Sequence, residues 1–212
     1  MIKSKTKRIH FYGDVFTSTA LLSAITFDSI EAAFDWYNFS FRDPKLVAGF
    51  VAWARAEISR FCDLFARQAF RPDLNTEVVA SCVVDALENC RRLGYRGLDL
   101  SIFLQERLAA SVTSALESRA AVHYARVNAA IELDDFQTCL PVDTPDWPAA
   151  FFPLSGHKIT SSLTVLAAVA LSLFGEVKPL VQSKLVSCCS DTLVRFIDTF
   201  SDSLIASFKN SD

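Results

Sequence analysis

Glycine and proline are scarce in this chain, with 6 glycines and 7 prolines among 212 residues. No regular succession of alternating apolar runs ends in Asn-Gly or Asp-Gly turns, so all-β and βαβ organisations lack the turns that they require. Hydrophobic residues make up 51% of the chain, which is enough for a continuous core. The remaining class is all-α, and this is the predicted fold class.

Positive charge is not in excess either, because the formal net charge is −3 at pH 7 and the isoelectric point is near 5.6. A nucleic-acid-binding domain needs a basic face over much of its surface, so we expect no nucleic-acid partner. One basic cluster, Lys3, Lys5, Lys7 and Arg8, opens the chain without the apolar core of a signal peptide behind it. The sequence predicts a basic tail over residues 1–10 and no export signal.

Paired cysteines are missing as well, since none of the six cysteines belongs to a Cys-x-x-Cys motif. Most lie within apolar helical patterns, which predicts reduced core residues of a cytoplasmic protein. Cys188 and Cys189 are adjacent, but consecutive residues rarely bridge each other, so core packing is favoured over redox chemistry. The six are Cys62, Cys82, Cys90, Cys139, Cys188 and Cys189.

The stretch from Leu46 to Phe70 shows the clearest helical pattern. Its apolar residues recur at steps of three and four, which places them on one face that must be buried. Trp53 widens this face, so we expect a core tryptophan, with an exposed anchor for a partner as the alternative. The residues on the face are Val47, Val51, Ala54, Ile58, Phe61, Phe65 and Ala69.

Five further helices follow from the same periodicity. The first is apolar almost all round, so neighbouring helices must cover it. Asn75 or Thr76 caps the third helix and Gly94 stops it. A connection rich in proline separates the fourth helix from the fifth. The expected ranges are about 14–39, 44–70, 76–94, 101–134, 158–174 and 186–208, with the proline-rich loop at 135–156.

The most apolar run lies in the fifth helix, between Leu163 and Phe174. It is shorter than the roughly 20 residues that a membrane-spanning helix needs. We therefore expect a buried helix here.

No arrangement of side chains indicates catalysis, a cofactor or a metal, so no catalytic, cofactor-binding or metal-binding residue is predicted. His123 lies on the apolar side of its helix, where a satisfied core histidine is favoured over a metal ligand. The segment 94–97 has two glycines but follows a helix, which favours a helix-ending turn over a phosphate loop. Glu132, Asp134 and Asp135 end a helix and are expected to be solvated.

Three blocks of the chain carry a further signal. The first block is Trp53-Ala54-Arg55-Ala56-Glu57-Ile58 with Phe61, Phe65 and Arg67-Gln68-Ala69-Phe70. The second is Val79-Ala80-Ser81-Cys82-Val83 to Leu93 with Gly97-Leu98-Asp99-Leu100. The third is Asp134-Asp135-Phe136 with Ser155-Gly156-His157-Lys158-Ile159-Thr160-Ser161-Ser162-Leu163 and Val177-Lys178-Pro179-Leu180-Val181. In this order, over about residues 11–208, the chain resembles the C-terminal helical region of the exocyst component 8 family. These are rod-like tethering subunits built from cullin-repeat-like helical bundles.

The expected architecture is an elongated stack of two to three antiparallel helical bundles. Successive amphipathic helices with short connections bury their apolar stripes against their sequence neighbours, which favours such a stack. The resemblance implies the same cullin-repeat-like arrangement for a single helical domain over residues 11–209. A compact single bundle is the alternative.

The resemblance implies a noncatalytic subunit of the exocyst tethering complex, acting in the docking of secretory vesicles at the plasma membrane. It implies other exocyst subunits as partners, no small-molecule substrate, and a cytoplasmic protein peripheral to vesicles and exocytic sites. The basic tail is expected to add at most a weak attraction to anionic membrane. Alternatives are a helical adaptor or scaffold outside secretion and a small-molecule-binding helical protein.

The chain departs from the family in one respect. No coiled-coil heptads and no pleckstrin-homology-like β domain precede the helices in the sequence. Small-GTPase or phosphoinositide binding is therefore not assigned. A fragment, a shortened gene product and a divergent homologue are all consistent with this departure.

Overall fold

The computed structural model describes residues 2–41, 43–71, 73–134, 160–183 and 185–210. Within these ranges the chain forms six α-helices and one 3-10 helix and contains no strand. The predicted all-α class is confirmed. The elements are α1 (Ile2–Ser40), α2 (Pro44–Ala69), α3 (Thr76–Tyr95), α4 (Ser101–Glu132), α5 (Ser161–Val177), η1 (Lys178–Gln182) and α6 (Val186–Asn210).

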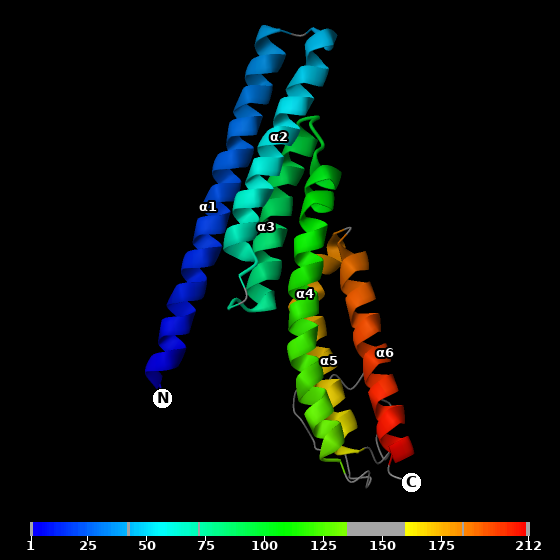
Figure 1. The fold of residues 1–212 in the computed structure, drawn as a ribbon. Helices are drawn as coiled ribbons and strands as arrows, with labels where there is room; N and C mark the ends of the chain where they lie inside the picture. Colours follow the sequence, from blue (N-terminus) through cyan, green and yellow to red (C-terminus); the bar gives the residue numbers. More distant parts are fainter. Residues whose placement is uncertain (1, 42, 72, 135–159, 184, 211–212) are drawn as a thin grey trace. The chain divides into compact units, whose positions relative to one another are not determined.

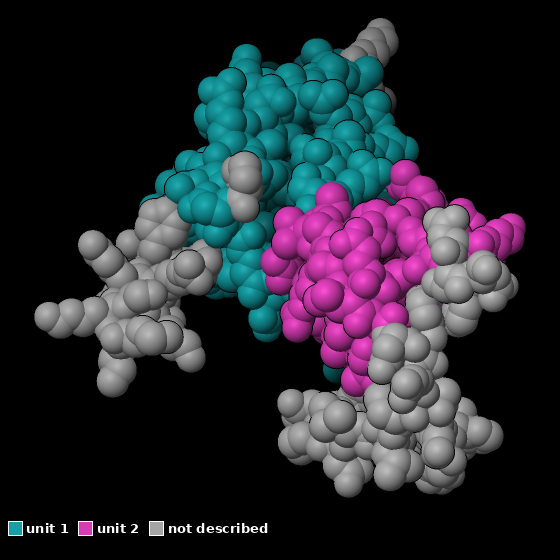
Figure 2. All heavy atoms as spheres, turned by 60° about the horizontal axis from the view of Figure 1, so that its bottom comes forward, with its two compact units in different colours: residues 1–118, 176–190 teal, residues 119–175, 191–212 magenta. Residues whose placement is uncertain are grey.

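The chain divides into two compact units (Figure 2). Unit 1 comprises Met1–Ser118 and Glu176–Ser190, and unit 2 comprises Arg119–Gly175 and Asp191–Asp212. The boundaries between them fall within α4, near the end of α5 and within α6. Each unit has a buried core of its own.

Unit 1 is built on helices that run antiparallel to their neighbours in sequence (Figure 1). α1 packs against both α2 and α3, and η1 packs against α3. The rings of Phe27 in α1 and Phe61 in α2 meet edge to face, with their centroids 5.2 Å apart. Small and medium side chains of α3 complete this core: Val79, Ala80, Val83, Ala86, Cys90 and Leu93 are all buried.

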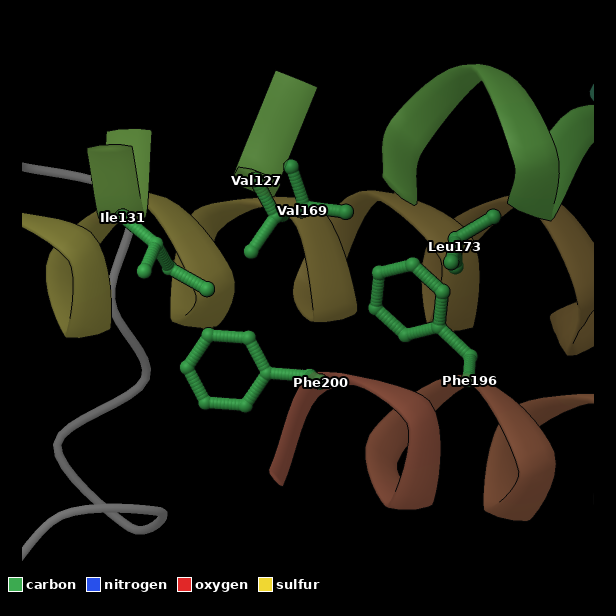
Figure 3. Packing of buried hydrophobic residues seen from close by; sticks show 6 residues of the cluster. All are labelled: Val127, Ile131, Val169, Leu173, Phe196 and Phe200. Atoms are coloured by element: carbon green, nitrogen blue, oxygen red, sulfur yellow. The ribbon is translucent and has the colours of Figure 1, made fainter. Parts of the chain in front are cut away.

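Unit 2 has a core of six buried residues contributed by α4, α5 and α6 (Figure 3). The rings of Phe196 and Phe200 in α6 lie among aliphatic side chains of the other two helices. Tyr124 and Ser203 add a hydrogen bond between their hydroxyl oxygens, which are 2.5 Å apart. The aliphatic members are Val127, Ile131, Val169 and Leu173.

The ends of α3 show how local sequence sets the helix boundaries. The Asn75 side chain accepts a hydrogen bond from the backbone N–H of Glu77, so the predicted cap is confirmed. The helix does not stop at Gly94, as the sequence suggested. It ends at Tyr95, and Gly97 reverses the chain with φ of 99°, a conformation that favours glycine. Leu98 N–H donates to the Leu93 carbonyl, which completes a Schellman motif.

The first and fifth helices differ most from the predicted ranges. The first helix begins at Ile2 instead of near residue 14. Lysine and arginine have nearly the same intrinsic helix propensity as leucine, so the basic residues at the start of the chain are compatible with a helix. The fifth runs over Ser161–Val177 and continues into η1, which the periodicity did not reveal because the segment is only five residues long. The proline-rich loop expected at 135–156 lies outside the described residues.

α5 is less buried than predicted, because one side of it is exposed. Val169 and Leu173 are buried, whereas Leu163 and Phe174 are 37% and 51% exposed. The stretch Ser161–Val181 is also longer than the apolar run considered above, and its length and mean hydropathy of 1.6 would suffice to cross a membrane. Core helices of water-soluble proteins meet the same two criteria, so this stretch alone assigns no membrane span.

Asp134 corrects a second expectation from the sequence. It is buried, not solvated, and its carboxylate accepts a hydrogen bond of 2.8 Å from the backbone N–H of Ser162. A carboxylate at this position satisfies a free N–H at the start of α5 and interacts favourably with the helix dipole. Glu132 is exposed, as expected, and Asp135 lies outside the described residues.

Candidate protein interaction surface

α1 is apolar on two opposite sides, and only one of them is buried. The buried side faces α2 and α3 and includes Phe27 and Ile30, which are each 1% exposed. Two small polar residues share this side, and the Thr19 hydroxyl donates hydrogen bonds to the carbonyls of Val15 and Phe16. The buried side consists of Val15, Thr19, Ser23, Phe27, Ile30 and Tyr37.

The opposite side carries a second set of apolar residues, which we call the exposed row: Leu21, Ile25, Ala32, Trp36 and Phe39. Four of them are large and are between 59% and 86% exposed. At 100° per residue, these positions fall within a sector of about 60°, and at 1.5 Å per residue they span about 27 Å. No described residue of unit 1 covers this side, although the sequence predicted that neighbouring helices would.

The exposed row continues into an aromatic cluster at the turn between α1 and α2. Phe34, Trp36 and Tyr37 come from α1, Phe41 follows it, and Phe50 and Trp53 come from α2. The Phe50 ring lies between Tyr37 and Trp53, with centroid distances of 5.2 and 5.4 Å. Trp36 packs edge to face on Phe41 at 5.0 Å. Aromatic pairs in this range stabilise one another beyond the area they bury.

Part of the aromatic cluster is exposed because α3 is too short to reach it: Trp36, Phe41 and Trp53 are 62%, 47% and 40% exposed. The last turn of α3 lies level with Asp35, since the Arg96 guanidinium is 3.5 Å from the Asp35 carboxylate. Beyond this point α1 and α2 extend past the end of α3 (Figure 1). Within this part of the hairpin, Tyr37 is buried, and its hydroxyl donates a 2.8 Å hydrogen bond to the carbonyl of Asp43. That bond ties the turn to α1.

Two predictions for α2 are wrong for the same reason. Val47 was expected on a buried face, and Trp53 was expected in the core, but they are 44% and 40% exposed. The alternative for Trp53, an exposed aromatic anchor, fits its position. The buried face of α2 begins only at Ala54, where α3 is alongside, and continues through Ile58 and Phe65.

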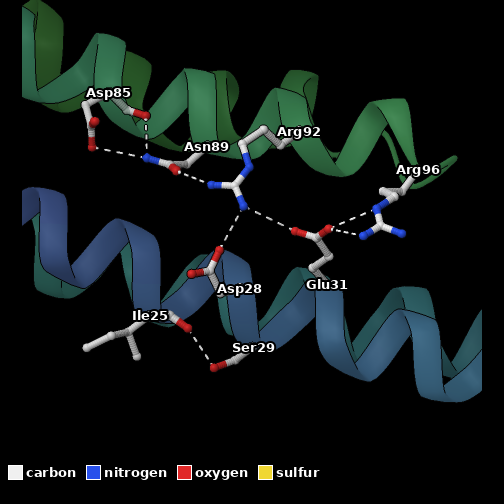
Figure 4. A network of polar contacts seen from close by, with 8 residues as sticks. All are labelled: Ile25, Asp28, Ser29, Glu31, Asp85, Asn89, Arg92 and Arg96. Carbon is white, nitrogen blue, oxygen red and sulfur yellow. Dashed lines mark hydrogen bonds and ion pairs between the residues drawn. The ribbon is translucent and has the colours of Figure 1, made fainter.

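A band of charged side chains borders the exposed row on the side of α3 (Figure 4). The Arg92 guanidinium is 3.0 Å from the Asp28 carboxylate and 3.3 Å from that of Glu31. Arg96 is 2.7 Å from Glu31. These pairs join α1 to α3 and keep the acidic side chains in place, while Ile25 points away from them. Ion pairs this exposed contribute little stability individually.

The other residues considered from the sequence are not brought together into a site. His123 is buried in α4, as predicted, and takes part in polar or electrostatic interactions. Burial raises the pKa of Cys189 to about 11, which favours a packed thiol over a reactive one, and Cys188 is half-buried. Cys139 lies outside the described residues. Among those that are described, no group of histidine, cysteine and acidic side chains is arranged to hold a metal ion.

One cavity, of about 220 Å³, lies in unit 1 beside α3. Its lining is open and mixed in polarity, and it includes the ion pair between Glu88 and Arg91, whose nearest atoms are 3.0 Å apart. His123 does not line this cavity. The lining residues are Val84, Leu87, Glu88, Arg91, Ser101, Gln105, Pro179 and Ser183.

Comparison with known proteins gives a family match for the first part of the chain. Residues 1–101, which contain the exposed row and the aromatic cluster, match the family model described as exocyst component 84 C-terminal. Over these residues the chain is similar to the exocyst component 84 C-terminal family. The resemblance inferred from the sequence is confirmed over this part of the chain. No solved structure matches the chain.

Exocyst components of other organisms are similar to about half of the chain. The exocyst complex component EXO84 of Cryptococcus neoformans is 33% identical over 108 residues, which is 50% of this chain and 16% of the relative. Exocyst complex component 8 of Mus musculus is 32% identical over 110 residues, or 52% of this chain and 14% of the relative. The matched part is therefore about one seventh to one sixth of these relatives.

Sequence periodicity did not reveal the exposed row, because it shows which face of a helix is apolar and does not show whether a neighbouring element covers that face. One signal was available. A helix that is apolar almost all round needs neighbours on every side, and a short helical chain supplies few of them.

Proposed function

We propose that this chain acts as a noncatalytic subunit of the exocyst tethering complex, in the docking of secretory vesicles at the plasma membrane during exocytosis. Its contribution is to bind other exocyst subunits through helix faces. The observation that carries this proposal is the exposed row of α1, which lies within the residues that match the family. The names of the relatives, which place them in the exocyst complex, support it.

The physical support comes from the character of the exposed row. Large contiguous apolar patches are rare on monomeric proteins and mark interaction sites. Aromatic side chains such as Trp36 and Trp53 are enriched where protein interfaces bury most of their area, because they carry large apolar surface at low conformational cost. A helical hairpin that presents such residues is suited to binding another helix and provides no chemistry for a reaction.

The proposed location is cytoplasmic and peripheral, at secretory vesicles and exocytic sites. The basic residues Lys3, Lys5, Lys7 and Arg8 would add at most a weak attraction to anionic lipid, on the order of 1 kcal/mol for each basic residue near the surface. Such an attraction falls as salt screens it, whereas a contact made by apolar burial persists. Subunit binding is therefore expected to survive salt that abolishes binding to anionic vesicles.

Affinity purification of the tagged chain from its own cells, followed by mass spectrometry, tests this function. We expect exocyst subunits to co-purify at low and at moderate salt, compared with an untagged strain. Recovery of other proteins without any exocyst subunit would instead identify a helical adaptor or scaffold outside secretion. That result would overturn the proposed function.

A further inference from the structure

The exposed row has the dimensions of one helix–helix contact. It runs along a single side of α1, and its members are separated by 4, 7, 4 and 3 residues. This spacing matches the ridge of side chains that one helix inserts into the groove of another. The small residue at the middle, Ala32, allows close approach, while Trp36 and Phe39 give one end a broad aromatic surface.

The charges beside the exposed row restrict what can cover it. Between residues 15 and 40, α1 has the acids Asp28, Glu31 and Asp35 and no lysine or arginine. Arg92 of α3 and Arg96, which directly follows this helix, pair with these three carboxylates, so one negative charge of the three remains in excess. Asp28 and Asp35 are both exposed and lie next to the row on the helix surface.

This charge distribution disfavours two possible occupants. An anionic membrane would meet excess negative charge beside the apolar side chains, where peripheral membrane helices carry lysine and arginine. A second copy of α1 paired along residues 15–40 would bring only further carboxylates to the row, because the basic residues of α1 end at Arg8, 13 positions before Leu21. Like charges that face each other across an interface repel, which disfavours both of these occupants.

We propose that the exposed row docks an amphipathic helix of a different polypeptide, whose apolar stripe covers Leu21, Ile25 and Trp36 and whose lysine or arginine side chains face Asp28 and Asp35. This inference rests on the proposed function and specifies the partner for it. In this docking mode the exposed row is the ridge that enters the groove of the partner helix, and the partner contributes apolar residues at three- and four-residue spacing. Basic side chains on one edge of the partner set its orientation.

Site-specific photocrosslinking in the full chain tests the docking directly. A benzoylphenylalanine introduced at Ile25 is compared with one at Leu64, an exposed residue of α2. We expect Ile25 to crosslink to a peptide of an exocyst subunit that has apolar residues three and four apart and at least one lysine or arginine. Crosslinks to lipid or to a second copy of this chain would overturn the proposal, and so would yields at Ile25 no higher than at Leu64.

Substitutions supply an independent test. Leu21→Ser combined with Ile25→Ser should reduce recovery of exocyst subunits at least about tenfold, whereas Leu64→Ser should not change it. Asp28→Lys should also reduce recovery, and Asp63→Lys, at an exposed acid of α2, serves as its control. Unchanged melting temperatures show that each variant is folded. Equal recovery with all variants would refute the docking face.

The experiments distinguish failure of the proposed function from failure of the proposed docking face on α1. If the unmodified chain recovers no exocyst subunit, the proposed function is wrong. If it recovers them and the α1 variants recover them equally well, the function stands and only the docking face is wrong.

Discussion

The two sides of α1 have similar composition and opposite surroundings. Phe27 and Ile30 on one side are each 1% exposed, whereas Ile25 and Phe39 on the other are 59% and 86% exposed. The helix is the same and the side chains are of the same kinds. The difference lies in the neighbours, because α2 and α3 occupy one side and no described residue of unit 1 occupies the other.

This comparison shows that hydrophobicity alone does not separate a core from an interface. Apolar area is removed from water in both cases, by the chain's own helices or by a partner. α2 shows the same transition along its length. Its first turns, with Val47 and Trp53, are exposed, and the buried face begins at Ala54, where α3 runs alongside.

The largest expected effect compares the same substitution on the two sides. Phe27→Ala should destabilise the protein by about 3–5 kcal/mol, because it removes a buried ring that packs on Phe61. Phe39→Ala should change the stability by less than about 0.5 kcal/mol, because an exposed ring gains little from folding. Urea unfolding followed by circular dichroism measures both. Similar losses of unfolding free energy in the two variants would contradict the distinction between a buried and an exposed side of α1.

The second effect is a difference in thiol reactivity. Cys82 lies against the buried side, with its sulfur 3.2 Å from the Thr19 hydroxyl, and burial raises its pKa. A thiol introduced by Ile25→Cys on the exposed side should be alkylated about 100-fold faster at pH 8, since the accessible thiolate is the reactive form. Iodoacetamide labelling with peptide mapping gives both rates. Equal rates in the native protein would show that the exposed side is covered, and equal rates in denaturant are the control.

The same burial predicts how stability depends on pH. Burial raises the pKa of Cys62 and of Cys90 from 9.0 to about 12. The unfolded chain therefore loses these protons first, so the stability that the thiols contribute is complete below pH 9 and is lost as pH rises toward about 12. The loss of stability between pH 9 and about 12 should be smaller in the Cys90→Ala variant, because one of the two buried thiols is removed. An unchanged slope in that variant would contradict the assignment.

A third, smaller effect locates the end of the buried side. Tyr37→Phe removes the hydroxyl that donates to the Asp43 carbonyl and should cost about 0.5–1.5 kcal/mol. Tyr95→Phe, at a residue that is 73% exposed, is the matched control and should have almost no effect. Thermal unfolding distinguishes the two. No loss for Tyr37→Phe would mean that the hairpin end is not held by this bond.

The smallest effect concerns the charged band between α1 and α3. Arg92→Ala removes ion pairs to Asp28 and Glu31 and should cost up to about 1 kcal/mol, since the groups are partly exposed. Arg91→Ala removes only the pair with Glu88 within one helix and should cost less than Arg92→Ala, because the Arg91 guanidinium is fully exposed to solvent. High salt should reduce both losses. A loss for Arg92→Ala that is large and independent of salt would mean that the packing of its side chain, not its charge, matters.

The helices were predictable from the sequence because their apolar residues repeat at the helical period and their ends carry capping residues. Asn75 identified the start of α3. Its end was placed wrongly because two glycines stand close together, and only the backbone shows that Gly97 has positive φ. Asp134 was predicted to be solvated because its partner, the N–H of Ser162, is 28 residues away in the sequence.

The candidate surface was less predictable than the fold. The apolar residues of α1 were recognised, but their division into a buried side and an exposed row depends on where α2 and α3 lie. Trp53 was assigned to the core because it shares a helix with Ile58 and Phe65. Its exposure follows from the length of α3, which ends level with Asp35. No periodicity within α2 reports the length of another helix.

Carbene footprinting of the chain, free and within the affinity-purified complex, tests most directly whether the exposed row is an interface. Labelling of Leu21, Ile25 and Trp36 should be high in the free chain and fall several-fold in the complex, because a docked helix excludes the reagent. Tyr95, which is 73% exposed on α3, provides the internal reference and should keep its labelling. Equal labelling of the row in the free and assembled states would contradict the account.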